Sequence, residues 1–94
     1  MNIINNTQHQ QYQAELNGEK AYIEYRWYKG DLAFMHTSVP EQFEGLGIAS
    51  AMARFALNDA RKQGVKIMLY CPFMAGFVKK HPEYQDLVDK KYQQ

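Results

Sequence analysis

The sequence predicts an α/β fold in which an antiparallel β-meander is followed by a right-handed β-α-β unit and C-terminal helical segments. Three observations predict it: a glycine-containing turn between two strand-like runs, a long helical period in the middle of the chain, and an apolar run after that helix. The 94 residues provide for one hydrophobic core, so we expect a single domain over residues 1–94.

The first expected element is a β-hairpin. Residues 8–16 and 20–29 favour strands, and Asn17-Gly18 between them is typical of a tight turn in which both central residues have positive φ. Side chains alternate along the second strand, and one face is strongly apolar. We expect this face to point into the core, with Ala21, Ile23, Tyr25 and Trp27.

A third strand completes the expected meander. The turn at residues 29–31 leads into an apolar run at residues 32–39, which is consistent with an interior strand. The Asn/Gln-rich stretch at residues 5–13 is polar, and we expect its beginning to fray.

The segment from residue 46 to residue 63 changes to a helical period, with Gly64 placed to end the helix. Its apolar arc contains Leu46, Ala49, Met52, Ala53, Ala56, Leu57 and Ala60. Residues 65–71 form a fourth expected strand, closed by Pro72. A strand-helix-strand connection of this kind is right-handed and makes the two strands parallel, so their carboxyl ends and the helix N-terminus lie together.

The chain then continues with two expected helical pieces at residues 73–80 and 83–92, separated by His81-Pro82. Ligands of α/β folds bind at the carboxyl ends of the parallel strands. We expect the two helical pieces to cover that end.

Composition narrows the class of protein. The net charge is +1, from eleven basic and ten acidic residues, which gives no overall field toward nucleic acid or an anionic membrane. One cysteine excludes an internal disulfide, and no His/Cys spacing indicates a metal site. We expect a cytoplasmic protein, a monomer or homodimer, with no metal, no nucleic-acid partner and no membrane partner.

The loop between the third strand and the helix carries two glycines, Gly45 and Gly47. Unpaired N–H groups and the helix dipole make such a turn a binding site for phosphate oxygens. The alternative is that the glycines only shape a tight turn. The pattern of a P-loop is absent, and a dinucleotide fingerprint is disfavoured because Ser50 stands at the third position and the next strand offers Lys66 instead of an acid.

The pattern Gln42-x-x-Gly45-x-Gly47 resembles the acetyl-CoA loop of GNAT acetyltransferases. The likeness extends downstream to Cys71, Pro82 and Tyr84. Together these motifs resemble a minimal single-domain GNAT-like N-acetyltransferase family, and the expected fold is a truncated GNAT-like fold.

The resemblance implies a function. The protein would use acetyl-CoA as cosubstrate and transfer the acetyl group to an amine of an unidentified acceptor. The strand before the loop would pair with the pantetheine arm, and the loop would hold the pyrophosphate. The implied CoA-binding residues are Thr37, Val39, Gln42, Glu44, Gly45, Leu46, Gly47, Ile48 and Ala49. Lys79 and Lys80 either contact the 3′-phosphate of CoA or are simply solvated.

Two residues are implied catalysts. Cys71 relays the acetyl group or lies beside the thioester as a polarisable neighbour, or it is instead a buried packing residue. Tyr84 either protonates the departing CoA thiolate or packs in the core. His36 and Glu41 are the nearest candidate bases in the sequence.

Two other classes of function stay open at this point. The first is a non-catalytic CoA-binding or protein-interaction module that keeps the loop without a complete acceptor site. The second, ranked last because the overall charge is balanced, is a nucleic-acid binder that uses interleaved aromatic and basic residues, Tyr22, Arg26, Tyr28 and Lys29.

Overall fold

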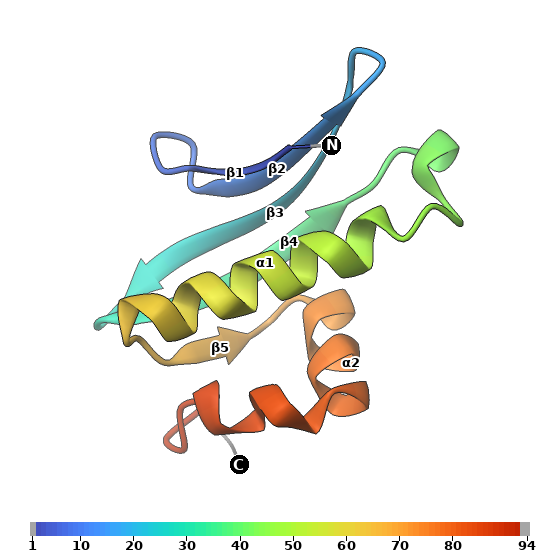
Figure 1. The fold of residues 1–94 in the computed structure, drawn as a ribbon. Coiled ribbons are helices and arrows are strands. Elements are labelled where there is room, and N and C mark those ends of the chain that lie inside the picture. Colours follow the sequence, from blue (N-terminus) through green and yellow to red (C-terminus); the bar gives the residue numbers. More distant parts are fainter. Residues whose placement is uncertain (1, 93–94) are drawn as a thin grey trace.

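The computed structural model describes residues 2–92, which form a five-stranded sheet with helices on one of its faces (Figure 1). The strands follow one another across the sheet in chain order. They are β1 (Ile3–Asn6), β2 (Gln11–Leu16), β3 (Glu19–Tyr28), β4 (Asp31–Ser38) and β5 (Ile67–Leu69).

Strands β1 to β4 are antiparallel neighbours, and β5 pairs parallel to β4. Helix α1 (Ile48–Gln63) connects β4 to β5 and crosses the sheet in a right-handed sense (Figure 1). The expected order of a meander, a right-handed β-α-β unit and C-terminal helical segments is therefore confirmed.

The predicted hairpin turn is confirmed, since Asn17 and Gly18 have φ of 53° and 80°. Ala21, Ile23 and Tyr25 of β3 are buried as expected, but the prediction for Trp27 is wrong, because that residue is 46% exposed. Trp27 lies next to the last residue of β3, where its ring packs edge-on against Tyr25.

The meander has one strand more than predicted. Residues 3–6 form β1, so the expectation that the beginning of residues 5–13 frays is wrong, because Asn5 and Asn6 lie in this strand. Asn5 accepts a hydrogen bond of 2.7 Å from the Tyr25 hydroxyl, and its amide lies 3.4 Å from Asp59 Oδ2. Tyr12 donates a hydrogen bond of 2.7 Å to the same carboxylate, so Asp59 of α1 holds both β1 and β2. Burial, with the Asp59 carboxylate next, raises the pKa of Tyr12 far above its usual value, which keeps the hydroxyl protonated as a donor.

Helix α1 buries the predicted apolar arc against the sheet, including Met52, Ala53, Ala56, Leu57 and Ala60. Gly64 ends the helix with φ of 73°, as predicted. The expected start at residue 46 is wrong, and Leu46 is 59% exposed. Gly47 has φ of 73°, which is not helical, so the period of the helix does not extend back to Leu46.

Strand β5 is shorter than the predicted run of residues 65–71. The backbone amides of Tyr70 and Cys71 both donate to the Phe34 carbonyl, at 3.1 and 2.9 Å. Two consecutive amides on one acceptor break the regular ladder, so β5 turns away from β4 at this point.

We expected both C-terminal helical pieces to cover the carboxyl ends of the parallel strands, and this expectation is only partly correct. Helix α2 (Pro72–Lys80) lies at the end of the sheet where β4 and β5 finish, whereas the 3₁₀ helix η2 (Pro82–Leu87) runs back along β5 (Figure 1). Val88 then forms a parallel bridge with Ile67. Only α2 therefore covers the expected ligand-binding end.

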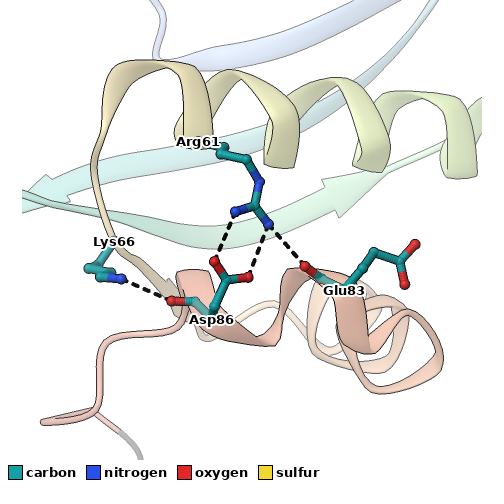
Figure 2. Close-up of polar contacts among 4 residues, drawn as sticks. All are labelled: Arg61, Lys66, Glu83 and Asp86. Atoms are coloured by element: carbon teal, nitrogen blue, oxygen red, sulfur yellow. Dashed lines mark hydrogen bonds and ion pairs between the residues drawn. The ribbon is translucent and has the colours of Figure 1, made fainter.

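Four hydrogen bonds fasten η2 to α1 and to Lys66, the residue before β5 (Figure 2). Arg61 donates to both carboxylate oxygens of Asp86, at 2.8 and 3.0 Å, and to the Glu83 carbonyl at 2.9 Å. Lys66 donates to the Asp86 carbonyl at 2.9 Å. The hydrogen bonds from Arg61 lower the pKa of Asp86 below its usual value, so the carboxylate stays charged as a partner. We call these four residues the Arg61 clamp.

Candidate functional site

The loop between β4 and α1 is shaped by one buried anchor and two left-handed glycines. It begins with a short 3₁₀ helix, η1 (Glu41–Phe43), whose Phe43 is buried in the core. Gly45 and Gly47 follow with φ of 80° and 73°, a conformation that side chains with a Cβ atom rarely adopt. The chain is thereby turned so that α1 starts directly after the loop.

The N-terminus of α1 carries no cap. No side chain bonds its first amides among the described residues, and its first turn contains no acidic residue. A Cβ atom built on Gly45 or Gly47 would meet no heavy atom within 4 Å, so the space in front of the loop is open. Free amides, the helix dipole and open space together make a site that fits phosphate oxygens.

The sheet forks beside this loop. β4 and β5 pair only as far as Phe34 and Leu69. Directly after Phe34 the register of β4 with β3 shifts, with Met35 left as the extra residue of a β-bulge. A bulge bends a strand and increases its twist, which is consistent with β4 leaving β5 here. Residues 35–38 of β4 have no strand partner on the β5 side among the described residues.

Thr37 and Cys71 meet in this fork. The bulge places Thr37 opposite Ile23, on the face of the sheet that α1 covers. The Thr37 hydroxyl lies 3.0 Å from the Cys71 sulfur, and Cys71 is 1% exposed. Cys71 also precedes Pro72 as the N-cap residue of α2. The structure therefore brings two of the sequence-predicted site residues into contact at the end of the sheet where the loop lies.

Tyr84 lies in a different environment. It belongs to η2, is 6% exposed, and its ring packs 6.4 Å from the Phe77 ring. The Arg61 guanidinium lies 6.0 Å from the centre of the Tyr84 ring. These contacts correspond to the packing role considered for this residue, and a catalytic role stays a prediction.

The two candidate bases belong to different elements, β4 and η1. His36 pairs with Glu24 across the strands on the face of the sheet opposite α1, with its ring 6.1 Å from that of Tyr22. Glu41 is the first residue of η1 and is exposed.

The other predicted residues of the loop differ in burial. Val39 is half-buried and packs against the core, whereas the side chains of Gln42, Glu44 and Leu46 are exposed.

Sequence reasoning missed a pocket of about 280 Å³ between α1 and α2. It is lined by Ser50 of α1 and by Phe73, Gly76, Phe77, Lys80 and His81. The aromatic residues four positions apart in the C-terminal piece, followed by a lysine, are the signal that could have indicated it. A larger cavity of about 470 Å³ lies beside the β2–β3 turn, but no residue of the loop lines it, and we give it no role in this site.

The uncapped N-terminus of α1 and the stretch of β4 without a partner on the β5 side therefore lie at the same end of the sheet. A profile of the GCN5-related N-acetyl-transferase family matches residues 11–87, and the chain belongs to this family.

Individual relatives are similar over most of the chain. Protein NATD1 of Danio rerio is 29% identical over 93 residues, covering 94% of this chain and 84% of the relative. Protein NATD1 of Mus musculus is 30% identical over 83 residues, covering 85% and 76%. The solution structure of a GCN5-like protein from Staphylococcus aureus matches with a TM-score of 0.73 and 23% identity, over 94% of this chain and 87% of that one, and it shows the shared fold. No helix among residues 2–92 has the length and hydropathy to span a bilayer.

Proposed function

We propose that the protein is an acetyl-CoA-dependent N-acetyltransferase. The observation that carries this proposal is the position of two features at one end of the sheet: the uncapped N-terminus of α1 behind Gly45 and Gly47, and the fork that contains Cys71. Membership of the GCN5-related family supports it independently.

Each half of acetyl-CoA has a matching surface. The pyrophosphate would accept hydrogen bonds from the backbone amides of Gly45 and of residues 47–50, since the amide of Leu46 already donates to the Phe43 carbonyl. The positive end of the helix dipole favours negative charge at this place. The pantetheine arm contains two amide groups, and it would pair with the backbone of Thr37 and its neighbours along the unpaired edge of β4. The thioester would then lie in the fork beside Cys71.

The chemistry exchanges one bond to the carbonyl carbon for another. In the direct route the unprotonated amine attacks the thioester carbonyl, the C–S bond breaks, and the CoA thiolate takes up the proton that the amine releases. In the relay route Cys71 loses its thiol proton and attacks first, giving an acetyl-cysteine and free CoA thiol. The amine then attacks the acetyl-cysteine, forming the amide and returning the proton to Cys71.

The test of binding is an amide NMR titration with acetyl-CoA. We expect the shifts to cluster at residues 37–50, and we expect Gly45→Val to abolish binding because the added side chain opposes positive φ and occupies the phosphate space. Gly30→Val is the matched control, since Gly30 also has positive φ and open space but lies in the β3–β4 turn at the other end of β4.

The test of turnover is release of the CoA thiol from acetyl-CoA in the presence of a panel of amines. Unchanged affinity in Gly45→Val, or shifts confined to other parts of the fold, would contradict the binding site. Binding of CoA without thiol release on any amine would instead favour the non-catalytic module.

A further inference from the structure

Another pocket, of about 270 Å³, lies on the face of the sheet away from α1. It is lined by residues of the β3–β4 turn, by Met68 of β5 and by the chain after η2. Met68 is 7% exposed but lies outside the core cluster, because neighbouring residues of a strand point to opposite faces and Ile67 faces α1. The contact of Thr37 with Cys71 lies on the α1 face, so this pocket is separate from the proposed donor site at the loop and the fork.

The chain after η2 forms one side of this pocket. The Asp89 amide donates to the Ile67 carbonyl at 3.0 Å, which holds the chain along the edge of β5. The Tyr92 amide then donates to the Asp89 carbonyl at 3.0 Å, and the Tyr92 hydroxyl donates to the Leu69 carbonyl at 2.7 Å. Tyr92 is therefore fixed at both its backbone and its hydroxyl, and its ring is a rigid wall.

The uncharged part of the lining suits an aromatic ring. Tyr28, the last residue of β3, is 52% exposed, although its ring borders the pocket. Tyr28 and Tyr92 offer aromatic contacts, and the Met68 thioether packs well against a ring. The volume is just below the range for drug-sized ligands, so the pocket suits a molecule with one ring and a short substituent.

The charged part of the lining consists of two carboxyl groups and two lysines. Asp31 and Asp89 share a hydrogen bond, which requires a proton on one of the two carboxyls. Lys29 and Lys91 form no ion pair with any residue from 2 to 92. A simple cation would meet the repulsion of the lysines, and a simple anion that of the carboxylates. A ligand with both an ammonium and a carboxylate matches both pairs.

We infer that this pocket binds a free α-amino acid with an aromatic side chain. Its ammonium would donate to Asp31 and Asp89 in place of the shared proton, which passes to the solvent. Its carboxylate would accept hydrogen bonds from the lysines, and its ring would lie over Met68 between the two tyrosines. A residue at a peptide end lacks one of the two charges, so the free amino acid is the better match. The inference goes beyond the proposed function, which places acetyl-CoA elsewhere in the fold.

The first experiment compares phenylalanine with three analogues by calorimetric titration. Phenylalanine amide lacks the carboxylate, N-acetylphenylalanine lacks the ammonium, and glycine lacks the ring. We expect phenylalanine to bind and each analogue to bind about tenfold or more weakly, as for the loss of one charge-assisted hydrogen bond or one buried ring. The absence of phenylalanine binding would overturn the inference. An amide that binds as tightly as phenylalanine would also overturn it, and would indicate a peptide N-terminus as the ligand.

The second experiment tests the charged residues with matched pairs of variants. Asp31→Asn and Lys91→Gln should each weaken phenylalanine about tenfold. Glu19→Gln and Lys90→Gln change the same charges on exposed residues outside the pocket and should leave the affinity unchanged. Equal affinities within both pairs would contradict the charge contacts and overturn the inference.

The third experiment tests the aromatic wall. Tyr28→Ala should weaken phenylalanine about tenfold or more, because a ring contact is lost. Tyr22→Ala is the matched control, since Tyr22 lies on the same face of β3 outside the pocket. Both variants should keep the wild-type affinity for acetyl-CoA, so a result here leaves the proposed function untouched. Equal phenylalanine affinities in Tyr28→Ala and the wild type would overturn the placement of the ligand in this pocket.

Discussion

The Cys71 sulfur lies 3.0 Å from the Thr37 hydroxyl, in the fork where the proposed function places the thioester. If Cys71 takes part in the chemistry, Cys71→Ala should keep CoA binding and slow acetyl transfer about a hundredfold or more. Thiol release and calorimetric titration on the same preparation measure the two properties separately.

The chain contains one cysteine, so a thiol-reactive reagent reports on Cys71 alone. Bound CoA should protect it from alkylation. Cys71→Ser is the matched control, because serine can keep the hydrogen bond to Thr37 but is a weaker nucleophile. Wild-type turnover in the alanine variant would show that the amine attacks the thioester directly and that Cys71 is a packing residue.

A second residue-scale prediction concerns two carboxyl groups at the other end of β4. Desolvation, together with a hydrogen bond to Asp89, raises the pKa of Asp31 to about 6, while the same hydrogen bond lowers the pKa of Asp89. A carboxyl whose pKa is raised on folding stabilises the fold below its ordinary value near 3.8, and this contribution is lost as the pH rises through 6. The lowered pKa of Asp89 acts in the opposite sense, with a contribution that is lost as the pH falls.

The contribution of Asp31 to wild-type stability should therefore fall from about pH 4 to about pH 6, by no more than about 1 kcal/mol, since this carboxyl is near solvent. Asp31→Asn should remove this decline, because an amide donates to Asp89 at every pH. Urea unfolding across this pH range measures the effect. Glu19→Gln, which removes an exposed carboxylate at the start of β3, is the control. An Asp31→Asn protein with the wild-type pH profile would contradict the shared proton.

At the scale of elements, the features with local causes were predictable from the sequence. The turn at Asn17-Gly18 and the end of the helix at Gly64 could be predicted, because each depends only on the backbone conformation of the residues themselves. Strand β1 was missed because its residues include two asparagines, which are depleted in strands, although it pairs with β2 across a short turn and also contacts α1 through Asn5. The bulge at Met35 was missed because only the pairing with β3 reveals an extra residue.

The same distinction divides the candidate site. The glycine loop is contiguous, so its residues could be named in advance. The contact of Thr37 with Cys71 joins β4 to the start of α2, and the pocket between α1 and α2 joins Ser50 to α2. Both depend on how the strands and helices are packed, which a spacing along the chain does not encode.

The Arg61 clamp carries the element-scale prediction. Asp86→Asn should lower the melting temperature, because the bidentate ion pair to Arg61 is lost and η2 is held less firmly. The difference from the wild type should shrink in 1 M salt, where exposed charges are screened. It should also vanish in acid, since a lowered pKa contributes stability that is lost as the pH falls through it.

Glu83→Gln is the control for the clamp, because Glu83 offers Arg61 its backbone carbonyl and the substitution leaves that carbonyl in place. Its side chain faces Arg54 and His81 instead. Equal melting temperatures for Asp86→Asn and wild type at low salt would show that the buried residues of η2, not the clamp, hold the segment.

At the scale of the whole molecule, one hydrophobic core joins residues from the sheet, α1, α2 and η2, all on the same face of the sheet (Figure 1). The proposed donor site uses the end of this layer, where the loop, the fork and α2 meet. Its parts come from both sides of the β-α-β crossover, so the site exists only when β5 and α2 are docked.

The strands lie in the sheet in the order of the chain, and this order affects how quickly the parts of the site, the loop, the fork and α2, assemble. Strands β1 to β4 are joined by short turns, so their contacts are local in sequence and can form early, whereas β5 must wait for the crossover through α1. We expect Leu57→Ala in α1 to slow refolding, and weakening of β1 mainly to speed unfolding, in stopped-flow experiments over a range of urea concentrations. Competence to bind acetyl-CoA should then appear with the slowest refolding phase, and binding in an earlier phase would contradict this order of assembly.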